Sequence, residues 1–150
     1  MGADLYIHSI RQQFETKYRQ QLDAAMNQGD ACEIARLAGL MNATGHFRDA
    51  YNLSSVLRPL GLSWWGGVSP MLDAAYLLKG ENLKQFRNMV STAKFKLPTI
   101  AEFRQAGVRL KKRGPRSRAG WRRHYVMGRA ELVAFLDQAI ALNTSVHCSL

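Results

Sequence analysis

The chain has 150 residues, of which 47% are hydrophobic and 21% charged, as in an ordinary folded domain, and this excludes general disorder. No apolar run is long enough to span a membrane, and the first ten residues lack the features of a secretory signal. We therefore expect a cytoplasmic protein without a membrane partner, in which Cys32 and Cys148 are reduced thiols; a disulfide between them is the alternative. The formal net charge of +10 is unusual and needs a physical explanation.

Apolar residues spaced three to four apart predict helices along the first half of the chain. The first helix covers residues 8–28 and ends at Gly29, and Asp30 is the expected cap of the next one. Ser54 and Ser55 have the residue type of helix caps, which predicts a short helix through Val56 and Leu57. Ser69 and Pro70 have the residue types of a helix start, which predicts a helix from residue 69 to about residue 78.

The second half has the same periodicity. It predicts a helix through Leu83, Phe86 and Val90, a shorter one opened by Pro98 and Thr99, and a last helix that starts near Trp121. Strand patterns are short, and only LYI near the start and the tail TSVHCSL could be extended. The predicted fold class is therefore all-α. Residues 1–150 would form a compact single-domain helical bundle of about five to seven helices, with a basic loop before the last helix.

The whole charge excess lies in residues 104–129, which we call the basic segment. It holds ten Lys or Arg residues and no acid, whereas the other 11 basic residues of the chain match its 11 acids. Glycines, a proline and mutual repulsion of like charges predict a mobile loop at residues 109–120. A block of this kind creates a local field that attracts an anion.

The composition of the basic segment favours nucleic acid as its partner. Most of its cations are arginines, which bind phosphate with two hydrogen bonds and stack on bases, and Trp121 adds a stacking face. This combination is typical of RNA and single-strand binding. An acidic protein surface is the alternative partner, and a solvated loop without a binding role is the third interpretation. The predicted binding residues are Arg109, Lys111, Lys112, Arg113, Arg116, Arg118, Trp121, Arg122, Arg123 and Arg129.

No catalytic or metal-binding motif appears in the chain. The four histidines and two cysteines lack ligand spacing, and there is no Gly-rich phosphate loop, so we expect no metal and no cofactor. The most enzyme-like stretch is residues 46–52, where Asp49 could orient His46 or pair with Arg48. The competing interpretation is a structural turn, in which Asp49 and Asn52 bind backbone groups and the aromatic residues pack inward.

Several motifs resemble, in the same order, a group of small uncharacterised proteins of bacteria and their phages. They are MGADLYI at residues 1–7, FRDAYN at 47–52, GLSWW followed by PMLD at 61–73, and ELVAFLDQAI with CSL at 131–150. The resemblance covers at most half of the chain and implies a compact, mostly helical domain of mobile-element type. It implies no agreed enzymatic activity and no catalytic residues. Residues 81–129, including the basic segment, depart from the group.

The segregated charge and this resemblance predict a non-enzymatic accessory protein of a phage or mobile element. It would bind nucleic acid or a nucleoprotein complex through the arginine-rich loop and inhibit a host defence effector, as anti-CRISPR proteins do. One alternative is a protein–protein interaction module for an acidic partner. The other is a small RNA-cleaving or modifying enzyme that depends on His46 or His124.

Overall fold

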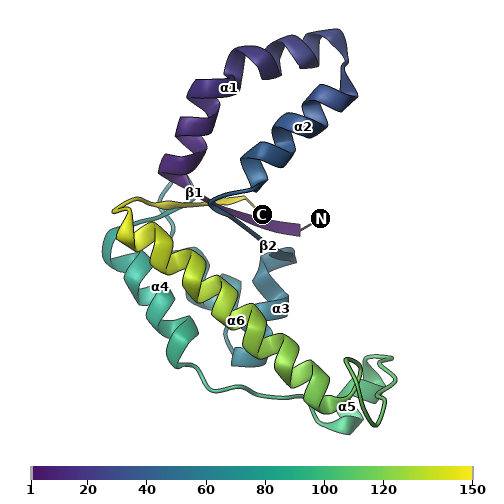
Figure 1. The fold of residues 1–150 in the computed structure, drawn as a ribbon. Coiled ribbons are helices and arrows are strands. Elements are labelled where there is room, and N and C mark those ends of the chain that lie inside the picture. Colours follow the sequence, from purple (N-terminus) through teal and green to yellow (C-terminus); the bar gives the residue numbers. More distant parts are fainter. Residues whose placement is uncertain (1, 150) are drawn as a thin grey trace.

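The computed structural model describes residues 2–149, and it shows that the all-α prediction is wrong. Helices dominate at 64%, but 11% of the residues form a four-stranded antiparallel sheet, so the fold is α/β. The strand order is β2-β1-β4-β3, and the two segments nearest the chain ends, β1 and β4, occupy its centre (Figure 1). The strands are β1 (Gly2–Ile7), β2 (His46–Ala50), β3 (Leu77–Leu78) and β4 (Val146–Ser149).

Side-chain alternation explains why β1 forms a central strand. Ala3, Leu5 and Ile7 are fully buried, whereas Gly2, Asp4 and Tyr6 between them are only partly buried. Successive residues of a strand point to opposite faces, so β1 has one apolar and one polar face. The four strands have only two to six residues, so the alternation repeats too few times in the sequence to be distinguished from coil. Strands β1 and β4 nevertheless lie in the two segments, LYI and TSVHCSL, for which an extended backbone was predicted.

Helices α1 (His8–Gln28) and α2 (Ala31–Asn42) form a hairpin between β1 and β2, and this hairpin lies on one side of the sheet (Figure 1). The predicted boundaries of α1 and the predicted cap of α2 are confirmed. Gly29 ends α1 in the left-handed conformation, at φ 66°, and the Asp30 side chain accepts a hydrogen bond from the Glu33 backbone N–H at 3.0 Å.

The core lies on the other side of the sheet. Here α3 (Ser54–Leu57), α4 (Gly80–Thr92) and α6 (Arg118–Ala141) cover the apolar face of β1 (Figure 1). Phe86 of α4 and Leu136 of α6 are fully buried in this core. Short helical turns connect these elements; they are η1 (Tyr51–Leu53), η2 (Arg58–Leu60), η3 (Trp64–Val68) and η4 (Ser69–Met71).

The helix predicted at residues 69–78 is wrong. Ser69 and Pro70 begin only the single turn η4, and the chain then turns into strand β3. The side chain of Asp73 explains the difference, because it accepts hydrogen bonds from the backbone N–H groups of Ala75 and Leu77, at 2.9 and 3.0 Å. A short acidic side chain that binds nearby backbone donors stabilises a turn at the expense of a helix.

Helix α6 extends beyond the core. Its buried residues, from Leu132 to Ala139, lie in its C-terminal half. Its N-terminal half projects from the body, and the short helix α5 (Ile100–Gln105) and the loop that joins α5 to α6 lie at its far end (Figure 1). No helix within residues 2–149 combines the length and the apolar character that crossing a membrane requires.

Candidate nucleic-acid interface

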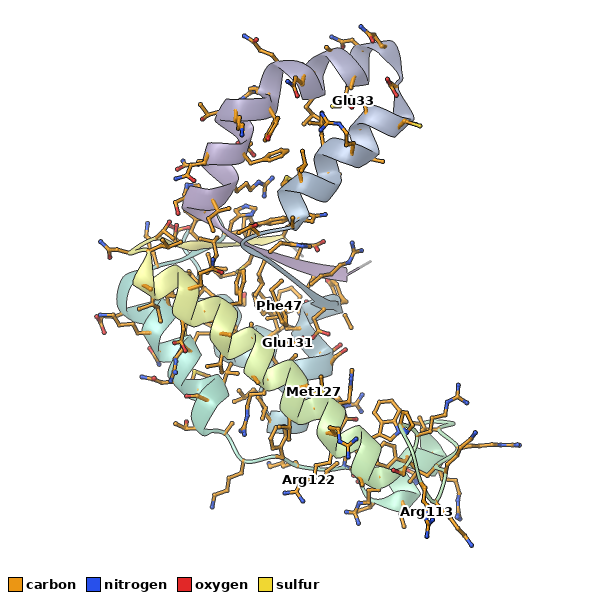
Figure 2. All side chains as sticks on the ribbon, viewed as in Figure 1. Glu33, Phe47, Arg113, Arg122, Met127 and Glu131 are labelled. Carbon is orange, nitrogen blue, oxygen red and sulfur yellow. The ribbon has the colours of Figure 1, made fainter. Side chains whose placement is uncertain are left out.

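The basic segment forms the projecting end of the molecule. It covers the end of α5, the α5–α6 loop and the N-terminal half of α6, and it lies at the opposite end from the α1–α2 hairpin (Figure 1). Figure 2 shows Arg113 at this far end and Arg122 further along α6 toward the body. The excess positive charge, which the sequence places in one segment, therefore lies on one protrusion of the folded protein.

The cations of this segment have no acidic partner within residues 2–149. Nine of the ten are exposed, and only Arg129 is half-buried. Every ion pair in the described part of the chain lies elsewhere: in the α1–α2 hairpin, on the sheet, beside β3, on α4, or between α4 and the C-terminal half of α6. The positive potential of the protrusion is therefore left for an external anion to neutralise.

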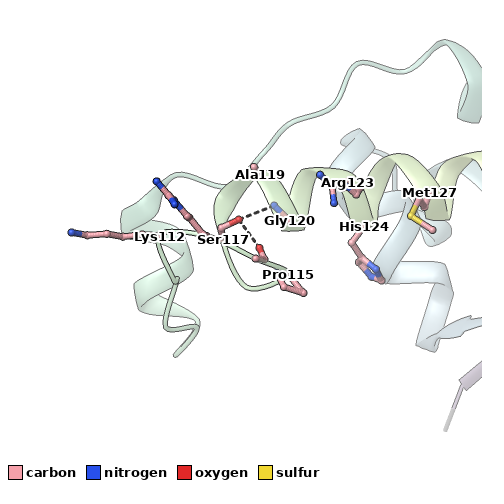
Figure 3. A pocket seen from close by; sticks show the side chains of 10 residues that line it. Lys112, Pro115, Ser117, Ala119, Gly120, Arg123, His124 and Met127 are labelled. Carbon is pink, nitrogen blue, oxygen red and sulfur yellow. Dashed lines mark hydrogen bonds between the residues drawn. The ribbon is translucent and has the colours of Figure 1, made fainter.

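Hydrogen bonds close the loop before α6. The Lys111 backbone N–H donates to the Arg116 carbonyl at 3.0 Å. The buried Ser117 hydroxyl donates to the Gly114 carbonyl at 2.6 Å and accepts from the Gly120 N–H at 3.0 Å (Figure 3). Ser117 thus caps α6 and holds the loop turn at the same time. The loop predicted at residues 109–120 is three residues shorter in the structure, because residues 118–120 form the first turn of α6.

Trp121 is not a free stacking surface in this conformation. Its ring packs against Phe103 of α5 and against Tyr125, each with ring centroids 5.8 Å apart, and its indole N–H is buried without a hydrogen-bond partner in residues 2–149. Phe103 is only 4% exposed. Covering these apolar rings stabilises the docking of α5 on α6. Trp121 therefore makes a packing contact within the protein, whereas the sequence predicted that it stacks on a base.

Arg129 also makes contacts within the protein. Its guanidinium lies 4.2 Å from the centroid of the Phe95 ring and donates to the Ala93 carbonyl at 2.9 Å. These contacts tie α6 to the segment that follows α4. Arg129 therefore differs from the other predicted binding residues, which have no hydrogen bond from their side chains within residues 2–149.

A shallow pocket of about 460 Å³ lies between the loop and the first turns of α6 (Figure 3). Lys112, Arg113 and Arg123 contribute its cations, and His124 adds an imidazole. No acidic residue occupies the first turn of α6, so the positive end of the helix dipole adds to these charges. His124 was not among the predicted binding residues. Its place directly after Arg122 and Arg123 was the only signal in the sequence that could have included it.

The arrangement of residues 46–52 contradicts the pairing of His46 with Asp49 and confirms the structural-turn interpretation only in part, since Phe47 packs against the core as predicted. His46 lies on β2 and bonds to Asp4 of β1, at 2.7 Å, and not to Asp49. Asp49 accepts from the Val56 backbone N–H at 3.2 Å, which confirms its predicted backbone role. The predicted role of Asn52 is wrong, because its side-chain oxygen is buried without a partner in the described chain. The inward packing predicted for Tyr51 is also wrong, since this residue is 49% exposed.

The residues that could act as acids or bases do not converge. His46 lies on the sheet, whereas His124 lies near the far end of α6 (Figures 1 and 3). Between residues 2 and 149, no group of three His, Cys, Asp or Glu side chains is placed to hold a metal ion.

Comparison with protein-family models, curated proteins and solved structures gives no match to this chain.

Proposed function

We propose that the basic segment binds the phosphate backbone of nucleic acid, alone or within a nucleoprotein complex. The observation that carries the proposal is the set of nine exposed cations on one protrusion without an ion pair in residues 2–149. Mutual repulsion of these charges costs free energy in the isolated protein, and phosphates remove that cost.

Backbone contacts are favoured over base readout. Trp121, the aromatic residue of the basic segment predicted to stack on bases, packs on Phe103, so its ring is not free for a base. Exposed arginines and lysines suit phosphate contacts that are independent of sequence. If five cations contact phosphates, log K falls with log salt at a slope of about −3.5 on single strands and about −4.5 on duplex DNA.

The biological setting follows from the resemblance to small proteins of bacteria and their phages. It supports a non-enzymatic accessory protein of a phage or mobile element, acting in the cytoplasm. Its target would be a nucleoprotein complex of host defence, in the manner of anti-CRISPR proteins. An acidic protein partner is the second candidate, because the same unpaired cations would attract a carboxylate-rich surface. The RNA-cleaving alternative gains no support from the separation of His46 and His124.

Purification of the tagged protein from its host, with and without nuclease treatment, distinguishes these candidates. The proposal predicts that RNA or DNA co-purifies, together with any protein that the nucleic acid recruits, and that nuclease removes both. Retention of an acidic protein after nuclease treatment would support the second candidate. Recovery of neither nucleic acid nor partner would contradict the proposal. A variant in which Arg113, Arg116, Arg118 and Arg123 are replaced by Gln serves as the negative control.

A further inference from the structure

A second polar cluster lies on the face of the sheet opposite the core. The strand register places Tyr6 between His46 of β2 and His147 of β4, and places Asp4 beside Arg48. Neighbouring strands are about 4.8 Å apart and alternate residues of a strand about 6.8 Å apart, so these five side chains share a patch about 10 Å across. They come from segments far apart in the sequence, and only the sheet brings them together.

Contacts inside the cluster fix the orientation of His46. Its Nε2 lies 2.7 Å from an oxygen of Asp4, and its ring stacks on Tyr6 with centroids 4.8 Å apart and 20° between the planes. A carboxylate only accepts hydrogen bonds, so Nε2 carries the hydrogen. The other nitrogen, Nδ1, has no hydrogen bond within residues 2–149, and 10% of the His46 side chain is exposed. Asp4 therefore holds an imidazole whose second nitrogen has no partner within the described residues.

The start of α1 borders the same patch. The Arg11 guanidinium lies 4.7 Å from the centroid of the Tyr6 ring and donates to Nδ1 of His147 at 3.3 Å. Its Nε donates to Glu15 at 3.1 Å. These contacts fix Arg11 and His147 at one side of the cluster, so the groups left open to solvent are those around Asp4.

Two groups beside Asp4 are hydrogen-bond donors, the Arg48 guanidinium and the Tyr6 hydroxyl. The Asp4 carboxylate already accepts from His46, and the Arg48 guanidinium lies 3.9 Å from it, beyond hydrogen-bond distance, with 66% of its side chain exposed. Burial and the nearby Asp4 raise the pKa of Tyr6, so its hydroxyl keeps its proton. These two donors, the Arg48 guanidinium and the Tyr6 hydroxyl, fit a ligand that is rich in acceptor oxygens.

We propose that this face of the sheet is a separate binding site for a phosphate group, formed by Arg48, Tyr6 and His46, with Asp4 as the positioning residue of His46. A guanidinium can bind two phosphate oxygens at once. Because Nε2 of His46 carries the hydrogen, its Nδ1 can accept a hydrogen bond from a P–OH group of the ligand. The phosphate belongs to a nucleotide, a sugar phosphate or free phosphate. This site is independent of the basic segment.

Nuclear magnetic resonance of the imidazole C–H groups tests the site in the wild-type protein. Inorganic phosphate is titrated at constant ionic strength, with His46→Gln and His124→Gln variants to assign the signals. We expect saturable shifts of the His46 signals at about 1–10 mM phosphate, and any shift of His124 reports the basic pocket separately. Unchanged His46 signals, or equal shifts with acetate, would overturn the proposal.

Two further titrations and three variants locate the ligand. Adenosine monophosphate and glucose 6-phosphate distinguish a nucleotide from a sugar phosphate, and equal Kd values for both and for free phosphate mean that the phosphate alone is recognised. We expect Arg48→Met and Asp4→Asn to raise the phosphate Kd at His46 at least about five-fold. Arg36→Met, which removes an exposed cation from α2, should change it less than about two-fold. A folded Arg48→Met variant with an unchanged Kd would contradict the assignment.

Discussion

The carbonyl oxygen of Gly114 lies against the α-carbon of Gly120, in the space that a β-carbon at residue 120 would fill. The carbonyl oxygen of Pro115 would meet the same β-carbon at 2.5 Å. The basic loop therefore packs on the first turn of α6 so closely that only glycine fits at residue 120. This contact determines how the cations of the loop are positioned relative to those of α6.

Replacing Gly120 with Ala should push the loop turn away from α6. The overlap involves backbone atoms, and because the loop adds little to the core we expect the loop to move without unfolding the body. The amide hydrogens of Lys111 and Ser117, which donate to carbonyls within the loop, should exchange at least about ten-fold faster, while amides of α4 keep their protection.

Gly39→Ala on α2 is the matched control, because a β-carbon there meets nothing within 4 Å. It should leave loop exchange unchanged and stabilise the helix by up to about 1 kcal/mol. Equal loop protection in Gly120→Ala and wild type would show that the loop does not pack on α6 in solution.

Arg129 and Arg122 lie on the same helix and should behave in opposite ways. Arg129→Met removes the contact with Phe95 and the hydrogen bond to Ala93, so we expect the free energy of unfolding to fall by about 1–2 kcal/mol. Arg122→Met removes an exposed charge and should change it by less than about 0.5 kcal/mol while weakening nucleic-acid binding. Urea unfolding and binding titrations check both. The reverse pattern would mean that the contacts of Arg129 do not form in solution.

Acid should destabilise the protein through His147. Burial lowers the pKa of His147 below its ordinary value of 6.5, and the charges of Arg11 and His8 lower it further. Between the lowered folded value and 6.5 the unfolded chain binds more protons, so stability is complete above about pH 6.5 and falls as the pH decreases toward the folded pKa. Urea unfolding between pH 7.5 and pH 5 should show a smaller loss for His147→Gln than for wild type. Parallel pH profiles would exclude this role of His147.

The two thiols should differ strongly in reactivity. Burial raises the pKa of Cys148 to about 12, whereas Cys32 is exposed on α2, and both are free. The thiolate is the reactive form, so at pH 8 a thiol reagent should modify Cys32 quickly and Cys148 only after denaturation. Cys32→Ser should remove the fast phase. Fast reaction of both thiols in the native protein would show that β4 leaves the sheet readily.

Local signals allowed part of this structure to be predicted. Helix α1 ends at Gly29 and α2 begins at Asp30 because a left-handed glycine and an acidic cap act within a few residues of the chain. Thr99 similarly starts α5, with its side chain and that of Glu102 forming a capping box. The basic segment is also local, since it is a block of composition.

The sheet and the polar cluster could not be predicted in the same way. Strand β1 pairs with β4 across nearly the whole chain length, and β3 has only two residues, too few for any periodicity. His46 finds its carboxylate in Asp4, 42 residues earlier, although Asp49 is nearer in sequence. The alternation of β2 turns Asp49 to the opposite face from His46, which is why the closer acid is not its partner.

The salt dependence of single-stranded RNA binding tests the role of the basic segment most directly. Fluorescence anisotropy between 50 and 300 mM salt should give a log–log slope of about −3.5 for the wild type. Replacing Arg113, Arg116, Arg118 and Arg123 with Gln should reduce the slope to about −1 and weaken binding at low salt at least about 100-fold. Replacing Lys17, Arg19, Arg36 and Lys84 with Gln removes the same net charge outside the basic segment and should leave the slope within about one unit of wild type. Equal losses in the two variants, or wild-type binding that salt does not weaken, would contradict a phosphate-binding protrusion.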